Sequence, residues 1–504
     1  MAQILPFDRL IIIDRSGDTA VYLQIANAFM HHIRMGVLRR GLQLPGTREL
    51  AVQLGVNRNT IKAALDELAA QGWIETLPRK GIFVAHDLPE VKTSRVLGAG
   101  GMAVRGGSAA SGEAMAVSRA NFDMLYVDED PTTDRKRHSG NIFIDDGFPD
   151  IRLAPMDIFL REIRSLSGLS SFRQYLHYGS PAGTDYLIST LTTYLNDTRG
   201  LHIGKQHLMT TRGVQMGTYL AASILLKPGS QVIVGEPGYA YANKTFEKLG
   251  AVLNRVPVDE QGIDVSAVEA LCKRKKISLL YVMPHHHSPT TVRLSPQRRI
   301  QLLELANRYR VAIVEDDYDY DFHYDSSPVP PMASLDHYGN VIYVGTLSKT
   351  LVPAARIGFM AGPENFIQLA AKRRSLIDFQ GDAFMELALA GLFRSGAVSR
   401  HINKSVRVYR QRRDHFCGLL DGLGGRVEFV RPEGGMAVWT RWPGVDLPAL
   451  SEMAAGKGLD ISDGRFYNPP GRNYFGLRLG FASLDFKEQE LAIGILRDCL
   501  KKMR

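Results

Sequence analysis

The chain has 504 residues, more than one hydrophobic core usually serves, so its length predicts at least two domains. Hydrophobic residues make up 45% and charged residues 22% of the chain, and no apolar run approaches the roughly 20 residues of a membrane span. The first residues lack the order of segments of a signal peptide, so we expect a cytoplasmic protein without a membrane anchor. The net charge of +9 is compatible with nucleic-acid binding but does not establish it.

The three cysteines, Cys272, Cys417 and Cys499, lie far apart in the chain. Their spacing suggests neither a disulfide framework nor a CxxC zinc site. We therefore expect three buried thiols.

The first domain is expected over residues 14–86. Helical periodicity covers residues 21–35 and 47–54, and a third helix runs from Asn57, which can cap it, to residue 70. Two extended stretches, WIETL and GIFVA, follow and are separated by the turn PRKG. Three helices and a hairpin predict an α+β winged helix-turn-helix domain.

Residues 87–138 have the composition of a flexible linker, since most of this stretch is rich in Gly, Ala and Ser or polar and Pro-containing. Within it, MAVSRANFDMLYV is compatible with one short helix. The linker leaves residues 139–504 for a second, larger domain.

The second domain alternates helical stretches, at residues 185–196, 217–226 and 295–310, with short apolar strands. QVIVGEP, SLLYVMP, VAIVEDD, NVIYVGT and RIGFMAG each predict a buried parallel strand that runs into a loop. This alternation indicates a doubly wound α/β domain, whose ligands bind at the carboxyl ends of the strands.

The run LPGTRELAVQLGVNRNTIKAALDELAAQGWIETLPRKGIFV resembles the winged helix of GntR-type regulators at nearly every landmark. The resemblance implies that Arg48 and Arg58 contact DNA, and arginine forks match guanine acceptors and phosphates. Where the family has a small GSG-like turn, this chain has basic residues that can grip phosphate or the minor groove. The alternative is that these side chains form only a solvated surface. The further expected DNA contacts are Asn59, Thr60 and Lys62 in the helix, and Arg79, Lys80 and Gly81 in the wing.

NVIYVGTLSKTLVPAARIGFMAG, preceded by VAIVEDDYDYDF, resembles the fold-type-I aminotransferases. In that family the lysine, here Lys349, forms an internal aldimine with pyridoxal 5'-phosphate (PLP), which requires an amine that can lose its proton. Asp316 resembles the aspartate that pairs with the pyridinium nitrogen, and Tyr318 the hydrogen-bond partner of the phenolic oxygen. The family's EDDY pattern selects Asp316 over Asp317, although both acids are alternatively ordinary carboxylates at a strand end.

TTRGVQMGTYLAASILL resembles the phosphate-binding loop of the same family, in which backbone amides at a helix N-terminus bind the phosphate. Tyr239 matches the aromatic residue that stacks on the pyridine ring, with core packing as the alternative. Arg478 aligns with the arginine that grips a substrate α-carboxylate, with a structural role as the alternative. The expected phosphate ligands are Gly213, Val214, Gln215, Thr346, Ser348 and Arg356.

The chain departs from the family at PHHHSPTTV, where related aminotransferases carry an NPTG-like segment. Ser288 stands in this segment where the family has an asparagine that touches the cofactor. Neighbouring residues of an extended strand point to alternate faces, so His285, His286 and His287 cannot easily share one metal ion. We therefore expect a remodelled effector pocket and no metal site.

A GntR-like winged helix joined to an aminotransferase-like domain is the architecture of the MocR subfamily, and YGSPAG resembles that subfamily's YGDPAG segment. The resemblance implies a PLP-dependent transcription regulator that senses an amine or amino acid by forming an external aldimine, which alters its binding to double-stranded operator DNA. It also implies a head-to-tail homodimer. Two alternatives stay open: an active aminotransferase with an accessory DNA-binding domain, and a regulator that has lost PLP and uses the large domain for dimerisation.

Overall fold

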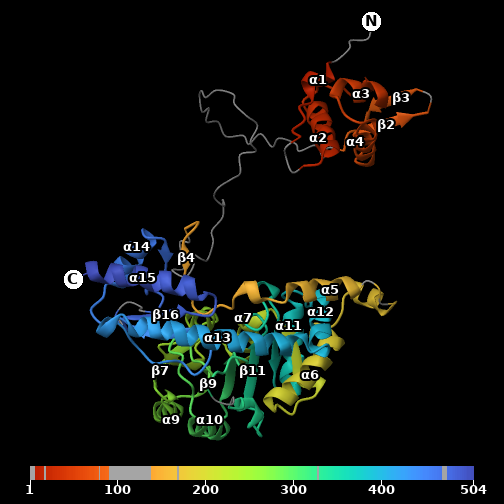
Figure 1. Cartoon of the computed structure of the whole chain (residues 1–504). Helices are drawn as coiled ribbons and strands as arrows, with labels where there is room; N and C mark the ends of the chain where they lie inside the picture. Colours follow the sequence, from red (N-terminus) through yellow and green to blue (C-terminus); the bar gives the residue numbers. More distant parts are fainter. Residues whose placement is uncertain are drawn as a thin grey trace, which may run out of the picture. The chain divides into compact units, whose positions relative to one another are not determined.

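The computed structural model describes residues 6–15, 19–78, 80–89, 138–166, 168, 170–325, 329–467, 471 and 474–503. The chain divides into two compact units, residues 1–123 and 124–504, which Figure 1 draws in sequence colours. Residues 90–137 of the expected linker, including MAVSRANFDMLYV, lie outside the described residues, and so does Arg79.

The first unit contains the three helices and the hairpin that the sequence predicts. A short helix and a short strand that the sequence analysis did not anticipate are also present. The three strands form one antiparallel sheet in the order β1-β3-β2. The elements are α1 (Phe7–Leu10), α2 (Val21–Arg34), β1 (Gln43–Leu44), α3 (Thr47–Leu54), α4 (Arg58–Ala70), β2 (Ile74–Leu77) and β3 (Gly81–Val84).

Local capping fixes the turn between α3 and α4. Gly55 ends α3 in the left-handed conformation, with φ of 61°, which a glycine adopts without strain. Asn57 then accepts a hydrogen bond from the amide of Asn59 and starts α4. Ile25 and Phe29 of α2 pack with the buried faces of α3 and α4 in a core of their own.

The large unit is built on an eight-stranded sheet in the order β5-β12-β11-β10-β9-β6-β7-β8. The inner strands β11, β10, β9, β6 and β7 run parallel, as expected of a doubly wound fold. The strands are β5 (Leu208–Thr211), β6 (Gln231–Glu236), β7 (Val252–Asp259), β8 (Gly262–Ile263), β9 (Ile277–Val282), β10 (Ala312–Asp317), β11 (Val341–Thr346) and β12 (Gly358–Ala361).

One strand direction in the sequence analysis was wrong. RIGFMAG was expected to form a parallel strand, but β12 pairs antiparallel with both β11 and β5. The connection of residues 347–357 contains a single short 3₁₀ turn, η5 (Pro353–Ala355), and no helix. Because a parallel crossover needs roughly a dozen or more residues, usually including a helix, so short a connection returns the strand antiparallel.

Helices cover both faces of the sheet. Leu220 of α7 and Phe246 of α8 pack in the hydrophobic core on one face, while Val268 of α9 and Leu302 of α10 pack in the core on the other. Figure 1 labels α7, α9 and α10 around the sheet. The helices that pack on or beside the sheet are α5 (Met156–Leu166), α6 (Asp185–Arg199), α7 (Gly213–Leu225), α8 (Ala240–Lys248), α9 (Val265–Arg274), α10 (Pro296–Tyr309), α11 (Glu364–Ser375) and α12 (Ala383–Arg394).

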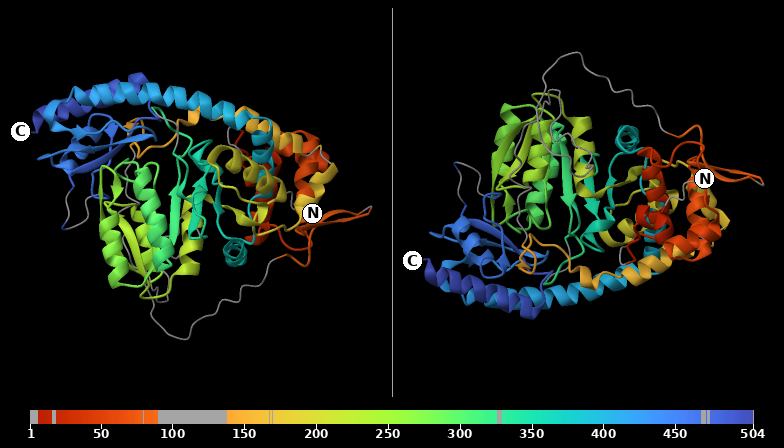
Figure 2. Two further views of the ribbon diagram at one scale, coloured as in Figure 1. Left: turned by 90° about the horizontal axis from the view of Figure 1, so that it is seen from below. Right: turned by 90° about the horizontal axis from the view of Figure 1, so that it is seen from above.

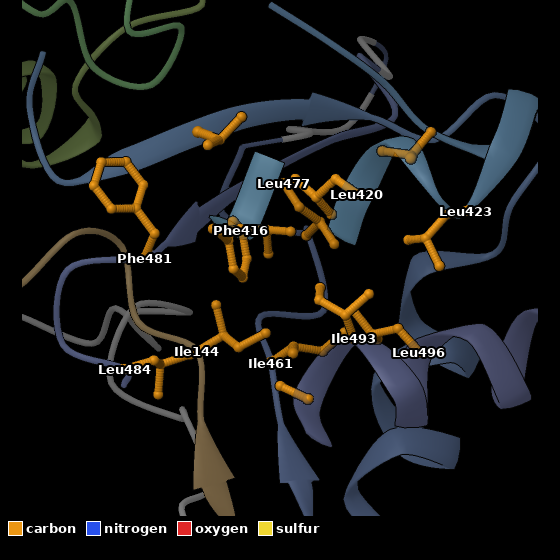
Figure 3. Close-up of a cluster of buried hydrophobic side chains, with 14 of the residues drawn as sticks. Ile144, Phe416, Leu420, Leu423, Ile461, Leu477, Phe481, Leu484, Ile493 and Leu496 are labelled. Atoms are coloured by element: carbon orange, nitrogen blue, oxygen red, sulfur yellow. The ribbon is translucent and has the colours of Figure 1, made fainter. Parts of the chain in front are cut away.

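The C-terminal part of the large unit has its own antiparallel sheet, in the order β13-β14-β16. The long helix α13 packs against α12 at one end and α15 at the other, and Figure 2 shows it in light blue along one side of the unit. Figure 3 shows the core between these elements, where Ile144 joins Phe416 and Phe481. The elements are β4 (Ile142–Phe143), α13 (Ala397–Asp421), β13 (Glu428–Phe429), β14 (Ala437–Arg441), α14 (Leu447–Ala455), β15 (Leu459–Asp460), β16 (Gly476–Gly480) and α15 (Phe486–Lys502).

Short 3₁₀ segments complete the large unit: η1 (Ile151–Leu153), η2 (Ser170–Leu176), η3 (Lys205–His207), η4 (Met332–Ser334) and η6 (Gly424–Arg426). Cys272, Cys417 and Cys499 are buried free thiols, which confirms the expectation for the cysteines. Within the described part of the chain, every helix is too short or too polar to cross a bilayer.

Candidate functional site

A cavity of about 420 Å³ opens at the carboxyl ends of the inner strands of the large unit. Its position is the one expected for the ligand of a doubly wound fold, and its volume falls within the roughly 300–1,000 Å³ typical of ligand pockets. The sequence-predicted residues that line it are Val214, Gln215, Tyr239, Asp316, Tyr318, Thr346, Ser348, Lys349, Arg356 and Arg478.

Lys349 reaches the cavity from the turn that follows β11. Its Nζ donates a hydrogen bond of 2.7 Å to the carbonyl oxygen of Gly147 and lies 4.0 Å from the centre of the Phe148 ring. Burial lowers the pKa of Lys349 to about 8, with Asp145 opposing the shift and Arg478 adding to it. An amine with this pKa is partly unprotonated near neutral pH, as a nucleophilic lysine requires.

Asp316 and Asp317 end β10 and face opposite sides of the sheet, as successive residues of a strand do. Asp316 lines the cavity, whereas Asp317 does not. Oδ2 of Asp316 accepts a hydrogen bond from the Tyr281 hydroxyl, and Oδ1 has no hydrogen-bond partner among the described residues. Burial, against the hydrogen bond from Tyr281 and together with the negative charges of Asp317 and Asp319, raises the pKa of Asp316 to about 8. A cationic group opposite Asp316 would lower this pKa and stabilise the carboxylate form.

Asp317 belongs to a separate buried cluster. Its Oδ1 lies 3.2 Å from Nδ1 of His285, and its Oδ2 accepts a hydrogen bond from the Tyr343 hydroxyl. Although burial alone would raise the pKa of Asp317, His285 and then Arg199 hold it well below its usual range. Asp317 is therefore committed to this cluster and is unavailable to a ligand in the cavity.

The N-terminus of α7 forms one end of the cavity. Gly213 begins this 13-residue helix with φ of 74°, and Val214 and Gln215 line the cavity behind it. Gly213 itself does not line the cavity; a Cβ atom at this position would lie 2.9 Å from the Arg356 guanidinium, so glycine permits the close approach of that side chain. Backbone amides at a helix N-terminus favour an anion.

Polar side chains from the β11–β12 connection face the same end. Oγ of Ser348 is buried and has no hydrogen-bond partner among the described residues. Nη2 of Arg356 donates 3.0 Å to the carbonyl oxygen of Arg212, and Arg356 adopts a left-handed conformation with φ of 49°. Thr346 accepts a hydrogen bond from the amide of Ser348. This end of the cavity can therefore surround an anionic group with a cation, hydroxyls and amides.

Arg478 and Tyr318 are joined at the other side of the cavity. The guanidinium of Arg478 donates to the carbonyl oxygens of Asp146 and Pro289, at 2.8 and 3.0 Å, and to the Tyr318 hydroxyl at 3.1 Å. That hydroxyl in turn donates 2.7 Å to the carbonyl oxygen of His286. Arg478 is 4% exposed, so an anion that reaches it is bound away from bulk water.

The three histidines of PHHHSPTTV follow β9 in a loop rather than a strand, and none of them lines the cavity. Nδ1 of His286 lies 2.8 Å from Asp319, and Nδ1 of His287 lies 2.9 Å from the Thr290 hydroxyl. Among the residues that the structure describes, no group of three His, Cys, Asp or Glu side chains could hold a metal ion. Ser288 does line the cavity.

In the first unit, Arg48 and Arg58 lie near the starts of α3 and α4, and both side chains are exposed. Nε of Arg58 donates 3.4 Å to the Thr47 hydroxyl, which links the two helix starts. Asn59 and Lys62 are also exposed, whereas Thr60 is half-buried. The arrangement presents arginines at helix N-termini, where a major-groove helix reads bases.

The β2–β3 hairpin forms the wing. The side chain of Lys80 is exposed, and its carbonyl oxygen accepts a 2.9 Å hydrogen bond from Gln43. Gly81 has φ of 114°, a conformation that other residues rarely adopt, so the turn requires glycine here. The structure therefore places one predicted wing cation at the surface.

Comparisons with known proteins identify both units. The family of bacterial regulatory proteins of the gntR type matches residues 21–84, and the aminotransferase class I and II family matches residues 147–493. The chain belongs to the aminotransferase class I and II family. It is 28% identical to the probable rhizopine catabolism regulatory protein MocR of Rhizobium meliloti, over 97% of this chain and 95% of the relative. The predicted MocR-type combination of domains is therefore confirmed.

Two solved aminotransferases share the fold of the large unit. Pyrococcus horikoshii kynurenine aminotransferase has a TM-score of 0.67 and 28% identity, over 72% of this chain and 92% of that one. LysN, an α-aminoadipate aminotransferase of Thermus thermophilus complexed with N-(5'-phosphopyridoxyl)-L-leucine, has a TM-score of 0.67 and 25% identity, over 72% and 93%. The class I and II aminotransferase fold implies PLP as the cofactor.

The cavity of this class I and II aminotransferase unit fits PLP. The unpartnered Oδ1 of Asp316 offers an acceptor for a protonated ring nitrogen, and the unpartnered Oγ of Ser348 offers a ligand for a phosphate. Lys349 has the lowered pKa that condensation with an aldehyde requires.

Several cavity residues escaped the sequence analysis. Two come from the segment DDGFPD, before α5, and two from the segment RFY, after β15. A turn-forming Gly-Phe-Pro and adjacent aromatics in a polar loop were the available signals. The residues missed are Asp146, Phe148, Tyr241, Met283, Pro353, Phe466 and Tyr467.

Proposed function

We propose that this chain is a PLP-dependent DNA-binding transcription regulator whose large unit senses an amino compound and thereby changes promoter binding by the winged helix. One observation carries the proposal: a single chain holds a GntR-type domain and a cavity that is lined by Lys349, Asp316 and Arg478. The cytoplasm is the compartment in which such a regulator works.

PLP, when bound, supplies an aldehyde that condenses with primary amines and a ring that withdraws electrons. We assign Lys349 as the amine that holds it, Asp316 as the partner of the ring nitrogen and Tyr239 as the stacking residue. Tyr318 lies between His286 and Arg478 and is assigned to the phenolic oxygen. The phosphate is assigned to Gly213, Val214, Gln215, Thr346, Ser348 and Arg356.

The position of Arg478 supports an effector that carries a carboxylate. Its guanidinium is fixed by two backbone carbonyl oxygens and one hydroxyl, so it is oriented before a ligand arrives. A carboxylate is the anion that an arginine fork binds best. We therefore propose that the effector is an amino acid or a related compound with both an amine and a carboxylate.

The winged helix is proposed to bind double-stranded operator DNA through Arg48 and Arg58. Exposed arginines at the starts of α3 and α4 support this role, since arginine pairs with guanine or with phosphate. Further contacts are assigned to Asn59, Thr60, Lys62, Lys80 and Gly81, and to Arg79, which the structure does not describe.

A homodimer, arranged head to tail, completes the proposal. Tyr178 and Leu376 are 87% and 81% exposed, and Phe379, 67% exposed, has its ring 5.7 Å from that of Tyr178. Large exposed apolar side chains of this kind favour an interface between proteins. Sedimentation of the full chain tests this part, because a monomer at micromolar concentration contradicts it.

The proposed function is tested by absorption spectroscopy together with operator binding. The PLP-loaded protein is titrated with amino acids and amines, and the fraction of operator bound is measured in the same samples. A rapid spectral change that persists and shifts DNA affinity supports a sensor. A spectrum that no amine changes contradicts the proposal.

A second candidate is an active aminotransferase that carries an accessory DNA-binding domain. The cavity favours it in one respect, since the lysine, the aspartate and the carboxylate-binding arginine are all in place. Steady conversion of the cofactor to its pyridoxamine form, reversed by a keto acid, identifies this activity. A stable spectrum after the initial change excludes it for the compound tested.

A further inference from the structure

A row of aromatic rings forms one wall of the cavity. The ring centres of Tyr239 and Tyr241 are 5.7 Å apart, those of Tyr241 and Phe466 are 5.7 Å apart, and those of Phe466 and Tyr467 are 5.0 Å apart. All four residues line the cavity. These distances are within the range of direct aromatic contact.

Two distant segments of the chain build this wall. Tyr241 belongs to α8 in the sheet-based part of the large unit, whereas Phe466 and Tyr467 belong to the loop between β15 and β16. Tyr467 is only 5% exposed, and its ring packs edge-on against Trp439 of β14 at 5.5 Å. The wall is therefore supported from behind by the C-terminal sheet.

Tyr239 is assigned to the cofactor, which leaves three rings without a role. Tyr241 is 41% exposed and Phe466 is half-buried, so both have surface that a ligand in the cavity can cover. Covering aromatic surface with another ring gains both the hydrophobic term and the aromatic contact.

The charges that line the cavity restrict the ligand further. Its cations are Lys349, Arg356 and Arg478, of which the first two are assigned to the cofactor and the third to the carboxylate. Among the lining residues that the structure describes, no other cation remains for an acidic side chain of the effector. Phe148 adds a further aromatic ring to the lining in addition to Tyr241, Phe466 and Tyr467, and this aromatic surface favours an uncharged ring.

We infer that the effector is an amino acid with an aromatic side chain. Its carboxylate binds Arg478, and its ring packs on Tyr241, Phe466 and Tyr467. This inference rests on the proposed function, because it takes the cofactor and the sensing role as given. It adds the chemical class of the side chain.

The test titrates the PLP-loaded full chain with single amino acids and follows the absorption of the cofactor. The panel is L-phenylalanine, L-tryptophan, L-alanine, L-glutamate and L-lysine. We expect each aromatic amino acid to reach half-saturation at a concentration about tenfold or more below that of L-alanine, since about 1.4 kcal/mol of ring contact is a factor of ten. Equal or tighter response to alanine, glutamate or lysine overturns the inference.

Two variants locate the selectivity. Phe466→Ala should raise the half-saturating concentration of L-phenylalanine about tenfold and change that of L-alanine less than about twofold. Tyr241→Ala should have the same effect, whereas Tyr241→Phe keeps the ring and should keep the preference. The matched control is Tyr338→Ala, because Tyr338 is 69% exposed, precedes β11 and does not line the cavity. An unchanged preference in both Phe466→Ala and Tyr241→Ala overturns the inference.

The outcomes separate this inference from the function on which it rests. If no amino acid changes the spectrum, the sensing role fails and the inference fails with it. If amino acids change the spectrum with alanine or glutamate preferred, the sensing role stands and only the aromatic assignment is overturned.

Discussion

The two units carry their candidate sites in opposite ways. In the first unit, the predicted DNA contacts fall within residues 48–81 and lie largely on exposed helix starts and a hairpin. In the large unit, the cavity draws on residues from Asp146 to Arg478, and much of its wall is buried. One site is a local motif on a small scaffold, and the other exists only when distant segments have packed together.

This difference determines how each site obtains its chemistry. The arginines of the first unit stay hydrated and act through their full charge, which makes their contribution sensitive to salt. In the cavity, burial brings the pKa of both Lys349 and Asp316 to about 8. Burial in the large unit thus changes the pKa of side chains in its site, whereas the first unit holds its arginines exposed to solvent.

The largest expected effect comes from removing Lys349. Lys349→Ala should abolish the absorption band of lysine-bound PLP, because no other lysine of the described chain lines the cavity. The variant should still bind operator DNA without an effector, since the winged helix has a core of its own. The absorption spectrum and an operator-binding assay measure the two effects.

The control for this variant is Lys372→Ala, which removes an exposed lysine of α11. It should leave the band unchanged. A full cofactor band in Lys349→Ala would show that the lysine assignment is wrong and would favour another role for the large unit.

The next effect tests whether the two units are stable independently. Phe29 is 1% exposed and packs against Phe7 with ring centres 5.5 Å apart. Phe29→Ala should destabilise the first unit by about 3–5 kcal/mol, the usual cost of removing a buried phenylalanine. Thermal unfolding followed by circular dichroism should show an earlier first transition, while the cofactor band is retained.

The matched variant in the large unit is Phe481→Ala, at a fully buried position of the core in Figure 3. It should lower the transition of the large unit and weaken cofactor retention. If either variant shifts both transitions equally, the two units do not unfold independently.

Sequence reasoning succeeded where the determining interactions are local. Asn57 and Gly55 fix the turn between α3 and α4 within a few residues, so the start of α4 was predictable. Lys349 and Asp316 were expected from the resemblance to fold-type-I aminotransferases, and both line the cavity because each follows or ends a buried strand. The carboxyl ends of parallel strands meet at one edge of a sheet.

It failed where geometry depends on partners far away in the chain. The direction of β12 is a different case, because its short connection to β11, residues 347–357, is visible in the sequence, whereas the run of apolar residues that predicted the strand does not indicate its direction. Phe466 and Tyr467 lie in a loop without periodicity, and only folding brings them to Tyr241. The short helix α1 was missed because its four residues are too few to show a period.

A smaller effect is expected at the exposed site. Arg58→Ala should weaken operator binding about tenfold to hundredfold, because one well-placed arginine contributes that much discrimination. If Arg58 contacts a phosphate, the slope of log affinity against log salt should also fall by about one. Fluorescence anisotropy at several salt concentrations measures both quantities.

Lys501→Ala is the control, because it removes an exposed positive charge from α15 in the large unit. Its operator affinity should match that of the unchanged chain. Equal affinity of the Arg58→Ala variant and the unchanged chain for the operator contradicts the assignment of Arg58 as a DNA contact.

The subtlest test of the comparison is the pH dependence of cofactor capture. Only an unprotonated amine condenses with an aldehyde, and an exposed lysine loses its proton near a pH of about 10.4. Burial lowers the pKa of Lys349 to about 8, Asp145 and Asp146 oppose this shift, and Arg478 assists it. The reactive fraction therefore rises as pH increases through about 8.

In cofactor-free protein mixed with PLP, the rate of band formation should reach half its maximum near a pH of about 8. Subtracting the rate of Lys349→Ala removes the reaction of surface lysines. A midpoint close to 10 would mean that Lys349 behaves like an exposed lysine. The contrast between a buried site that shifts the pKa of its lysine and an exposed site that does not would then be lost.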